Sequence, residues 1–438
     1  MSEGFLQRKA AWEILLKVSS GSYSDYALEK VLLNYNFSRL DIAFITELSY
    51  GCIRYRKLLD HWINHTSKLS YKKQPPKLRW LLHIGLYQIL KMDKIPDSAS
   101  ISTTVEIAKR TELSKLAGVV NGILRNTTRK LALKNLPILP LDESEKISLE
   151  ESLPLWLIDE MINWLGLEET KKIARSFNKK PLIDLRINSL KNTLNESLEL
   201  FEKYDIKAEK IEKLSSGIVL KTKPRSIKNL PGYREGNWVV QDRSSQLIAI
   251  LLNPKKGDKI LDACAAPGIK TTHIAELIKD QGEIFAVDRS EKRLKLLSEN
   301  LKRLNLQSVK VHKADATMLG SIKPELKSYF DKILIDAPCS GLGTLSRNPD
   351  ARWSINQIKI RELINLQEKL LENIIPLLKK DGVLVYSTCT ICPYENNYLI
   401  KSFLKKNNNL ELVNEKVILP NMEDSGDGFY AAKLAYKN

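Results

Sequence analysis

The chain has 438 residues, of which 43% are hydrophobic and 28% charged, so it is a globular protein too long for a single core. It has no apolar run close to the ~20 residues that cross a bilayer, and its start, "MSEGFLQRKA", lacks the apolar region of a signal peptide, so we expect a cytoplasmic protein with no membrane partner. Its 69 Lys and Arg against 52 Asp and Glu give a net charge of +17, which favours a nucleic-acid partner over a small neutral substrate, although solvated lysines alone would give the same balance.

Residues 1–135 are predicted to form a helical, basic domain. Apolar residues recur at helical spacing in four segments: "AWEILLKV", "DIAFITELSYGCIRY", "LRWLLHIGLYQILKM" and "LAGVVNGILRNTTRK". Basic residues such as Arg54, Arg56 and Lys57 lie near the expected helix ends. Cys52 falls within these helices and is expected to pack in their core.

Two shorter regions follow this helical domain. Residues 136–153 contain two prolines and an acidic run, which indicates a linker. Residues 154–235 predict a small α+β domain, with a helix in "PLWLIDEMINWL", a strand in "LIDLRIN", a helix in "TLNESLELFEKY" and strands in "IKAEKI" and "SGIVLKT".

From residue 236 to 438 the pattern alternates between strand and helix. The expected strands are "DKILDA", "EIFAVD", "VKVHKAD", "DKILIDA" and "GVLVYST". Helices are expected between them, at 271–279, 290–305 and 354–379. The second of these helices carries four leucines on one face, as a helix that covers a sheet does: Leu294, Leu297, Leu301 and Leu304. Repeated βα units predict a parallel, doubly wound sheet that binds ligands at the carboxyl ends of its strands, and "GFYAAKLAY" predicts a late antiparallel strand.

Four of the expected strands finish on an aspartate: Asp262, Asp288, Asp315 and Asp336. One such aspartate is most simply the cap of the next helix, but in a parallel sheet four in succession would cluster along one edge. Phosphate oxygens would be repelled there, and the first turn, "DACAAPGIKTT", is neither G-x-G-x-x-G nor a P-loop. The positive charge and hydroxyl groups of S-adenosyl-L-methionine suit this edge, and Asp288 would accept its ribose hydroxyls. The row of carboxylates therefore favours a methyltransferase.

Five cysteines form no disulfide framework in so long a chain, and three of them follow two of the expected strands. "DAPCSGLGTLSRNPDARW" brings Asp336 and Cys339 to the ligand edge, where two glycines would let the backbone approach a flat substrate. "STCTICPYENN" brings Cys389 and Cys392. A C-x-x-C pair suggests zinc or a redox dithiol. However, zinc needs four ligands, usually in two close pairs, so no metal is expected, and a redox dithiol needs no methyl donor.

Covalent catalysis on a pyrimidine is the third interpretation of these cysteines. Carbon 5 of cytosine is too electron-poor to attack a methyl donor, but addition of a thiolate to carbon 6, helped by an acid at N3, makes carbon 5 nucleophilic. A base must then remove the carbon-5 proton so that the thiol can leave. The chain offers candidates for the cysteine, the acid and the donor site, but these residues alone do not say which cysteine attacks. A paired, stacked cytosine must also be extruded first.

Several motifs closely resemble those of the Sun/Fmu-type RNA cytosine-5 methyltransferases: "DACAAPGIKTTHIAEL", "VDRS", "KADAT", "DAPCSGLGTLSRNPDARW" and "YSTCTICPYENN". The segments "ELSYGCIRYR", "GLYQILKMDKIP" and "GVVNGILR" resemble the NusB-like RNA-binding domain. This pairing is that of the bacterial subfamily that modifies 16S rRNA at cytosine-967. It implies an all-α NusB-like domain at 1–135, a linker at 136–153, a small α+β domain of RRM/ferredoxin-like type at 154–235 and an α/β Rossmann-like S-adenosyl-L-methionine methyltransferase domain at 236–438.

The resemblance also implies roles for single residues. Cys389 would attack carbon 6, Cys339 would assist product release and Asp336 would touch N3 of the base. The cofactor would lie on Cys264, Ala265, Ala266, Pro267, Gly268, Ile269, Lys270, Asp288, Asp315 and Asp336. Cys392 receives no role and is expected to be a small residue at the start of a helix.

Three positions depart from the family pattern. Ile269 stands where a second glycine is usual, Ser346 where arginine is frequent and Tyr394 where glutamate is frequent. Only the first bears on the backbone geometry of the cofactor loop. Arg186 and Arg352 are each a candidate RNA contact or a solvated arginine.

The expected partner is 16S rRNA, naked or early in subunit assembly, and the protein is expected to be a monomer. An alternative from another class is a non-catalytic RNA-binding or ribosome-assembly protein that works through its N-terminal helices. Another alternative is the same reaction on tRNA, against which the NusB-like half argues.

Overall fold

The computed structural model describes residues 3–222, 226–420 and 426–437. The chain forms two compact units. The helical unit comprises residues 1–178 and 348–354, and the sheet unit comprises residues 179–347 and 355–438. Nowhere in the described ranges does a helix combine the length and the apolar character that crossing a membrane requires.

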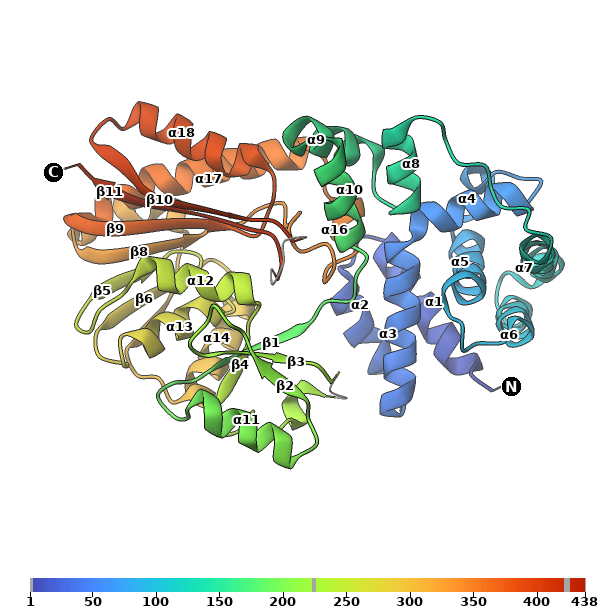
Figure 1. Ribbon diagram of the computed structural model, residues 1–438, viewed down its shortest axis with the longest axis horizontal. Coiled ribbons are helices and arrows are strands. Elements are labelled where there is room, and N and C mark those ends of the chain that lie inside the picture. The colour runs from blue at the N-terminus through green and yellow to red at the C-terminus, as the bar shows by residue number, and fades with distance from the viewer. Residues whose placement is uncertain (1–2, 223–225, 421–425, 438) are drawn as a thin grey trace. The chain divides into compact units, whose positions relative to one another are not determined.

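The helical unit consists of helices joined mostly by short turns, with a longer connection between residues 132 and 143 (Figure 1). These helices are α1 (Phe5–Ser19), α2 (Ser24–Leu32), α3 (Arg39–Arg54), α4 (Arg56–Thr66), α5 (Pro76–Lys91), α6 (Asp97–Lys109), α7 (Ala117–Ala132), α8 (Glu143–Glu150), α9 (Leu155–Leu165), α10 (Leu167–Ser176) and α16 (Ala351–Ser354), with 3₁₀ turns η1 (Tyr71–Lys73) and η2 (Ser114–Leu116). Their apolar faces meet in one core that includes Ile14, Leu48, Leu82 and Leu124. Cys52 is fully buried in this core, as predicted.

Helix α8 lies within the stretch that the sequence indicated as a linker. The Asp142 carboxylate accepts a hydrogen bond from the backbone N–H of Glu145 at 2.8 Å and caps the helix, and Glu143 lies in the first turn. Carboxylates at this end of a helix are favourable because the first N–H groups are unpaired and the helix dipole is positive there. The acidic run that indicated a linker is therefore a helix start.

The segment 348–354 comes from the middle of the predicted methyltransferase domain, yet it packs in the helical unit. Arg352 is fully buried and donates hydrogen bonds to the carbonyls of Ser152 and Phe177, both at 3.3 Å. Trp353 Nε1 donates to the Ile53 carbonyl at 2.7 Å. Neither interpretation of Arg352 as an RNA contact or a solvated arginine holds, because its guanidinium is enclosed by protein carbonyls.

The sheet unit begins with a small four-stranded antiparallel sheet of order β2-β3-β1-β4. Its elements are β1 (Ile183–Ile187), α11 (Leu194–Lys203), β2 (Ala208–Lys210), β3 (Gly217–Leu220) and β4 (Trp238–Val240). Thr193 and Glu196 form a capping box that starts α11. Phe201 of this helix packs with Leu185 and Trp238 in a separate core. The predicted α+β fold is confirmed.

A seven-stranded mixed sheet of order β10-β11-β9-β8-β5-β6-β7 forms the centre of the sheet unit. Its strands are β5 (Lys259–Asp262), β6 (Glu283–Asp288), β7 (Val309–Lys313), β8 (Phe330–Asp336), β9 (Leu378–Thr388), β10 (Leu410–Ile418) and β11 (Phe429–Tyr436). Strands β5 to β9 pair in parallel, whereas β11 pairs antiparallel with both β9 and β10. The sheet is Rossmann-like with a late antiparallel strand, as predicted.

Helices cover both faces of this sheet (Figure 1). On one face lie α12 (Arg243–Leu252), α13 (Ile269–Leu277) and α14 (Glu291–Leu304), and on the other lie α17 (Gln357–Ile374) and α18 (Asn397–Lys406). Short helical turns complete the unit: η3 (Ile227–Asn229), η4 (Ala316–Met318), α15 (Leu319–Ile322), η5 (Pro324–Leu326), η6 (Ile375–Leu377) and η7 (Pro393–Glu395). The four leucines of α14 are buried, as its period predicted. One apolar core on each face of the sheet leaves the carboxyl ends of the strands for ligands.

Candidate active site

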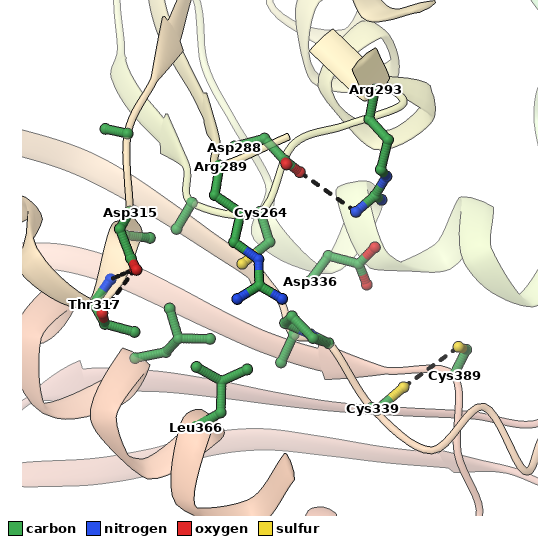
Figure 2. Close-up of a pocket in the computed structure, with 16 residues that line it drawn as sticks. Cys264, Asp288, Arg289, Arg293, Asp315, Thr317, Asp336, Cys339, Leu366 and Cys389 are labelled. Atoms are coloured by element: carbon green, nitrogen blue, oxygen red, sulfur yellow. Dashed lines mark hydrogen bonds and ion pairs between the residues drawn. The ribbon is translucent and has the colours of Figure 1, made fainter. Parts of the chain in front are cut away.

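Two cysteines from neighbouring loops meet at the carboxyl edge of the seven-stranded sheet. Strands β8 and β9 pair in parallel with Asp336 opposite Ser387, so the loops that follow them leave the sheet side by side. Cys339 lies on the first loop and Cys389 on the second, and their Sγ atoms are 3.4 Å apart (Figure 2). The N–H of Gly343 donates to the Cys389 carbonyl at 3.0 Å and joins the two loops again.

The contact between the two sulfurs favours the protonated form of Cys339. The pKa of Cys339 is raised well above its usual value, first by the hydrogen bond with Cys389 and then by burial. Two thiolates this close would repel each other, so Cys339 is held as the thiol of the pair. The ammonium of Lys270 interacts electrostatically with Cys389, and a cation of this kind stabilises a thiolate.

Asp336 ends β8 beside the sulfur pair and has two donors. Lys270 Nζ donates to its Oδ2 at 2.7 Å, and Ser387 Oγ donates to its Oδ1 at 2.9 Å. Burial would lower the pKa of Lys270, but the charge of Asp336 and this hydrogen bond outweigh it, and the pKa is raised. The ammonium also lies 5.1 Å from the ring centroid of Phe429, on β11. Asp336 is therefore fixed between the Lys270 ammonium and the Ser387 hydroxyl.

A cavity of about 290 Å³ opens beside these groups, and we name it the carboxylate cavity. Its lining includes Cys264, Asp288, Asp315, Asp336, Cys339 and Cys389 (Figure 2). Asp262, Asp288 and Asp336 are the last residues of their strands, and Asp315 lies two residues beyond β7. Three carboxylates in one wall suit a ligand with a positive charge and hydroxyl groups and oppose a phosphate. The cavity therefore fits S-adenosyl-L-methionine.

Asp288 is the most restrained of the carboxylates in this cavity. Its Oδ2 accepts the N–H of Ala266 at 3.2 Å, and its Oδ1 accepts the N–H of Ser290 at 2.8 Å, while Arg293 lies 3.6 Å away as an ion pair. These contacts orient the carboxylate at the end of the second parallel strand. A ribose diol is the ligand that a carboxylate at this place in the fold commonly accepts.

A second cavity of about 270 Å³, which we name the lysine cavity, shares Cys264 and Asp336 with the first. Its lining also includes Asp242, Asp262, Lys270 and Phe429. Five of the predicted cofactor residues line the lysine cavity and not the carboxylate cavity, namely Ala265, Ala266, Pro267, Ile269 and Lys270, and Gly268 lines neither. Burial raises the pKa of Asp262 to about 7, although the Thr271 hydroxyl donates to it at 2.7 Å.

The backbone at Gly268 and Ile269 shows why the cofactor loop accepts isoleucine at position 269, where a second glycine is usual in the family. Gly268 has a φ of +99°, and a Cβ there would lie 2.2 Å from a methyl carbon of Leu297, so glycine is required. Ile269 is the first residue of α13, and it needs no left-handed conformation. The isoleucine therefore fits the loop without strain.

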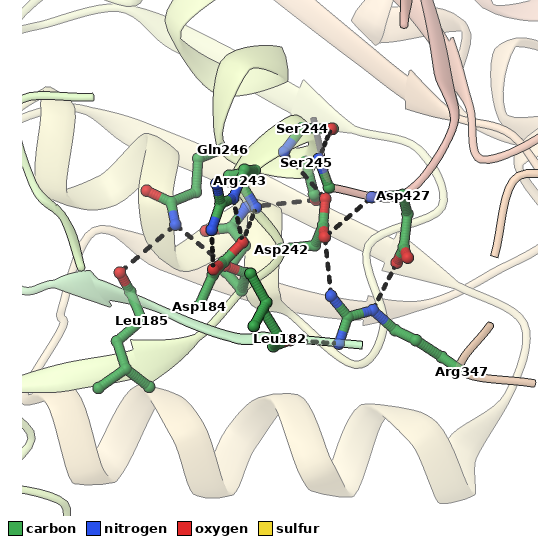
Figure 3. A network of polar contacts seen from close by, with 12 residues as sticks. Leu182, Asp184, Leu185, Asp242, Arg243, Ser244, Ser245, Gln246, Arg347 and Asp427 are labelled. Carbon is green, nitrogen blue, oxygen red and sulfur yellow. Dashed lines mark hydrogen bonds and ion pairs between the residues drawn. The ribbon is translucent and has the colours of Figure 1, made fainter. Parts of the chain in front are cut away.

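Arg347 holds the far end of the Cys339 loop and was not singled out by sequence reasoning. It donates to Asp242 at 2.8 Å, to Asp427 at 2.7 Å and to the Leu182 carbonyl at 3.0 Å (Figure 3). Asp242 also accepts the N–H of Asp427 at 3.0 Å. Burial and the charge of Asp242 raise the pKa of Asp427 to about 7 despite the arginine. No local signal predicts these contacts, because the partners lie 80 to 165 residues away.

Two residues named in the sequence analysis lie outside the chemistry. Arg186 is fully buried and pairs with Glu276 through hydrogen bonds of 2.8 and 2.9 Å, so it is neither an RNA contact nor a solvated arginine. Cys392 is buried and precedes η7, a small residue at a helix start as predicted. Within the described residues no group of three or more His, Cys, Asp and Glu side chains could hold a metal ion.

A Rossmann-like sheet whose edge carries a carboxylate-lined cavity defines a methyltransferase that uses S-adenosyl-L-methionine. The sequence matches three known families: 16S rRNA methyltransferase RsmB/F over residues 249–435, the NusB family over 6–129 and the methyltransferase RsmF/B-like, ferredoxin-like domain over 153–227. The chain is 43% identical to the "Probable ribosomal RNA small subunit methyltransferase B" of Synechocystis sp. over 402 residues, 91% of this chain and 89% of that protein. The chain belongs to the ribosomal RNA small subunit methyltransferase B family.

Further relatives agree with this assignment. The chain is 36% identical to the ribosomal RNA small subunit methyltransferase B of Photorhabdus laumondii, which covers 92% of each chain. Among solved structures, PH0851 superposes with a TM-score of 0.84 at 27% identity over 99% of both chains. The structure of NSun6 from Pyrococcus horikoshii with SFG matches 66% of this chain and 100% of its own length, with a TM-score of 0.60 and 25% identity.

Proposed function

We propose that the protein methylates carbon 5 of cytosine-967 in 16S rRNA, with Cys389 as the nucleophile, Cys339 as the group that assists product release and Asp336 as the contact to N3 of the base. The observation that carries this proposal is the 3.4 Å separation of the two sulfurs beside Asp336, in the wall of the carboxylate cavity. A redox dithiol would have the two cysteines of the C-x-x-C motif as partners, whereas here the partner of Cys389 is 50 residues away.

The electrostatic surroundings of the two cysteines support these roles. Cys389, which interacts electrostatically with the Lys270 ammonium, acts as the thiolate that adds to carbon 6. Cys339, with its raised pKa, remains a thiol during the addition. Once carbon 5 is substituted, its proton must leave and the bond from carbon 6 to Cys389 must break. Cys339 lies where it can take part in that second half of the reaction.

A carboxyl group must carry a proton before it can donate to N3, and Asp336 accepts a charge-assisted hydrogen bond from Lys270. Lys270 Nζ, at 2.7 Å, is the nearest source of that proton. With a neutral Lys270 and a protonated Asp336, N3 receives a hydrogen bond as negative charge develops on the ring. As an ionised carboxylate, Asp336 would instead accept from the 4-amino group of cytosine.

S-adenosyl-L-methionine, when bound, supplies a methyl group activated by its sulfonium. Asp288 and Asp315 would hold its hydroxyl and amino groups in the carboxylate cavity, where Cys264 of the cofactor loop is also part of the lining. Cys264 and Asp336 line both cavities, so they lie where the two cavities meet.

The other domains of the chain are proposed to bind the RNA and to position it at the active site. The NusB-like helices, residues 1–135, and the small α+β domain, residues 154–235, would contact rRNA phosphates, which accords with the net charge of +17. Residues 236–438 would carry the catalysis. Because the target base must be extruded, naked or early-assembly rRNA in the cytoplasm is the proposed substrate, and a monomer is the proposed active form.

Methylation of an unmodified 16S rRNA transcript with labelled S-adenosyl-L-methionine tests the reaction. The expected product is 5-methylcytosine at position 967, read by bisulfite sequencing. Its loss from the rRNA of a deletion strain is the matching observation in cells. A methyl group on tRNA alone, or none on any cytosine, contradicts the proposal.

Single cysteine variants test the two roles. Cys339→Ala should accumulate a protein–RNA adduct that survives denaturation, because elimination fails, whereas Cys389→Ala should form no adduct. Cys392→Ala is the matched control, since it is the same change on the same loop, and it should methylate at the wild-type rate. Exchange of the first two outcomes would reverse the assignment.

A further inference from the structure

Glu395 is a fully buried glutamate behind the two cysteine loops, and the chemistry proposed above does not use it. The donors that its carboxylate receives are neutral. Ser340 N–H donates to Oε2 at 2.9 Å, Gln367 Nε2 donates to the same oxygen at 3.0 Å, and the Ser340 hydroxyl donates to Oε1. Burial raises the pKa of Glu395. A carboxylate in such a place is costly for the fold unless the protein uses it.

The contacts of Glu395 reach the residue that follows each catalytic cysteine. Ser340 follows Cys339, and its hydroxyl also lies 2.7 Å from the hydroxyl of Thr390, which follows Cys389. Ser340 is therefore bonded to Glu395 through both its backbone and its side chain, and Thr390 is joined to the same group. One carboxylate thus connects the two loops directly behind the sulfur pair.

Further hydrogen bonds fix the Pro338 end of the Cys339 loop and the backbone of Glu395. Gln367, on α17, donates to the Pro338 carbonyl at 2.8 Å and to Glu395 from the same nitrogen. The hydroxyl of Tyr386, on β9, donates to the Glu395 carbonyl at 2.8 Å. Glu395 is therefore fixed relative to strand β9, from which the Cys389 loop leaves.

Asn396 completes the attachment of this segment. Its Nδ2 donates to the Thr390 carbonyl at 2.9 Å, and its Oδ1 accepts from the hydroxyl of Thr388 at 2.6 Å. The Cys389 loop is thus bonded on both sides of the cysteine to the residue next to Glu395. Movement of Glu395 would therefore move both loops.

We infer that Glu395 is the positioning residue that sets the separation of the Cys339 and Cys389 sulfurs. This inference rests on the proposed function for its consequence in catalysis, but the sulfur separation itself can be measured without RNA or cofactor. With the carboxylate removed, Ser340 and Thr390 lose their common partner and the two loops can separate. A displacement of 1 Å in reacting groups can cost about 100-fold in rate.

The first test uses diamide, which oxidises two nearby thiols to a disulfide and itself takes up the two electrons and two protons. In the full-length protein, diamide should form the Cys339–Cys389 disulfide, which mass spectrometry of proteolytic fragments detects. Glu395→Ala should slow this reaction about 10-fold or more, because the two sulfurs no longer share one fixed position.

Glu395→Gln separates position from charge. Its amide oxygen can still accept from Ser340 N–H and Gln367, and its NH₂ can donate to the Ser340 hydroxyl, which then donates to Thr390. Disulfide formation should stay within about threefold of wild type. The matched control is Glu415→Ala, which removes a hydrogen-bonded carboxylate elsewhere in the same unit, the acceptor of the Tyr430 hydroxyl, and it should behave as wild type.

The second test measures single-turnover methylation of 16S rRNA at saturating cofactor. Glu395→Ala should lower the maximal rate about 100-fold while the KM for RNA stays within about twofold, and Glu395→Gln should restore most of the rate. If Glu395→Ala fails to fold, Ser340→Ala replaces it. This variant loses only the hydroxyl bonds and should slow both reactions about tenfold.

The outcomes separate this inference from the proposed function. A wild-type rate of disulfide formation in Glu395→Ala, or in Ser340→Ala where that variant stands in, overturns the positioning role. Equal impairment of the Gln and Ala variants also overturns it, because charge rather than position would then matter. If diamide behaves as expected but wild-type protein methylates no cytosine, the positioning role stands and the proposed function fails.

Discussion

Replacing Arg186 with methionine is expected to lower the free energy of unfolding of the sheet unit by about 3–5 kcal/mol, the usual cost of leaving one partner of a buried ion pair alone. Arg186 is 0% exposed. Its guanidinium donates to both oxygens of Glu276, to the Ile269 carbonyl at 2.9 Å and to the Thr272 hydroxyl at 3.0 Å. Methionine fills similar space but satisfies none of these acceptors.

The double variant Arg186→Met/Glu276→Leu checks this magnitude. Because it removes both charges, it should recover most of the lost stability and come within about 2 kcal/mol of wild type. The single variant should also depend on pH. Burial raises the pKa of Glu276, and without Arg186 to oppose it that pKa rises further, so the variant should gain stability as pH falls and lose it as pH rises through the folded-state value.

Hydrogen exchange during urea unfolding, read by mass spectrometry on peptides from β1 and α13, measures the effect locally. Arg234→Met is the matched control, since Arg234 is exposed in the same unit and should change stability by less than about 0.5 kcal/mol. The reasoning is refuted if Arg186→Met unfolds like wild type while its RNA affinity falls and the salt dependence of binding decreases. That result would make Arg186 a phosphate contact.

Three further changes test other parts of the structure. Arg352→Met should destabilise the helical unit by about 2–4 kcal/mol, because buried carbonyls lose their donor, and the thermal midpoint of the helical signal measures this. Asp262 has a folded-state pKa of about 7, so the protein should lose stability as pH rises from about 4 to 7. The loss is at most about 4 kcal/mol, at 1.36 kcal/mol per pKa unit. Urea titrations at several pH values should show a flatter dependence of stability on pH for Asp262→Asn. Gly343→Ala would place its Cβ 2.1 Å from the Gly428 carbonyl oxygen, so single-turnover methylation should fall about tenfold or more, whereas Gly118→Ala, with open space around it, should not affect the rate.

The elements of the fold could be read from the sequence because their signals are local. The apolar period of α14 and the βα alternation depend on neighbouring residues and on the preference of a buried sheet for helices on both faces. The stretch interpreted as a linker shows how ambiguous a local signal can be, since acidic residues suit both a solvated linker and the first turn of a helix such as α8. The pairing of Cys339 with Cys389 was also expected, because adjacent parallel strands deliver their loops to one edge.

Short-range pattern in the amino-acid sequence was enough to predict the helical N-terminal domain, the parallel sheet, the row of carboxylates and the motif cysteines. Only the tertiary structure decided that Arg186 and Arg352 are buried, because arginine is exposed by default and burial depends on acceptors far away in the chain. It alone also revealed Arg347 and Glu395 as residues that bind the catalytic loops. Their partners lie up to 165 residues away, and a hydrogen bond across such a separation exists only once the chain has folded.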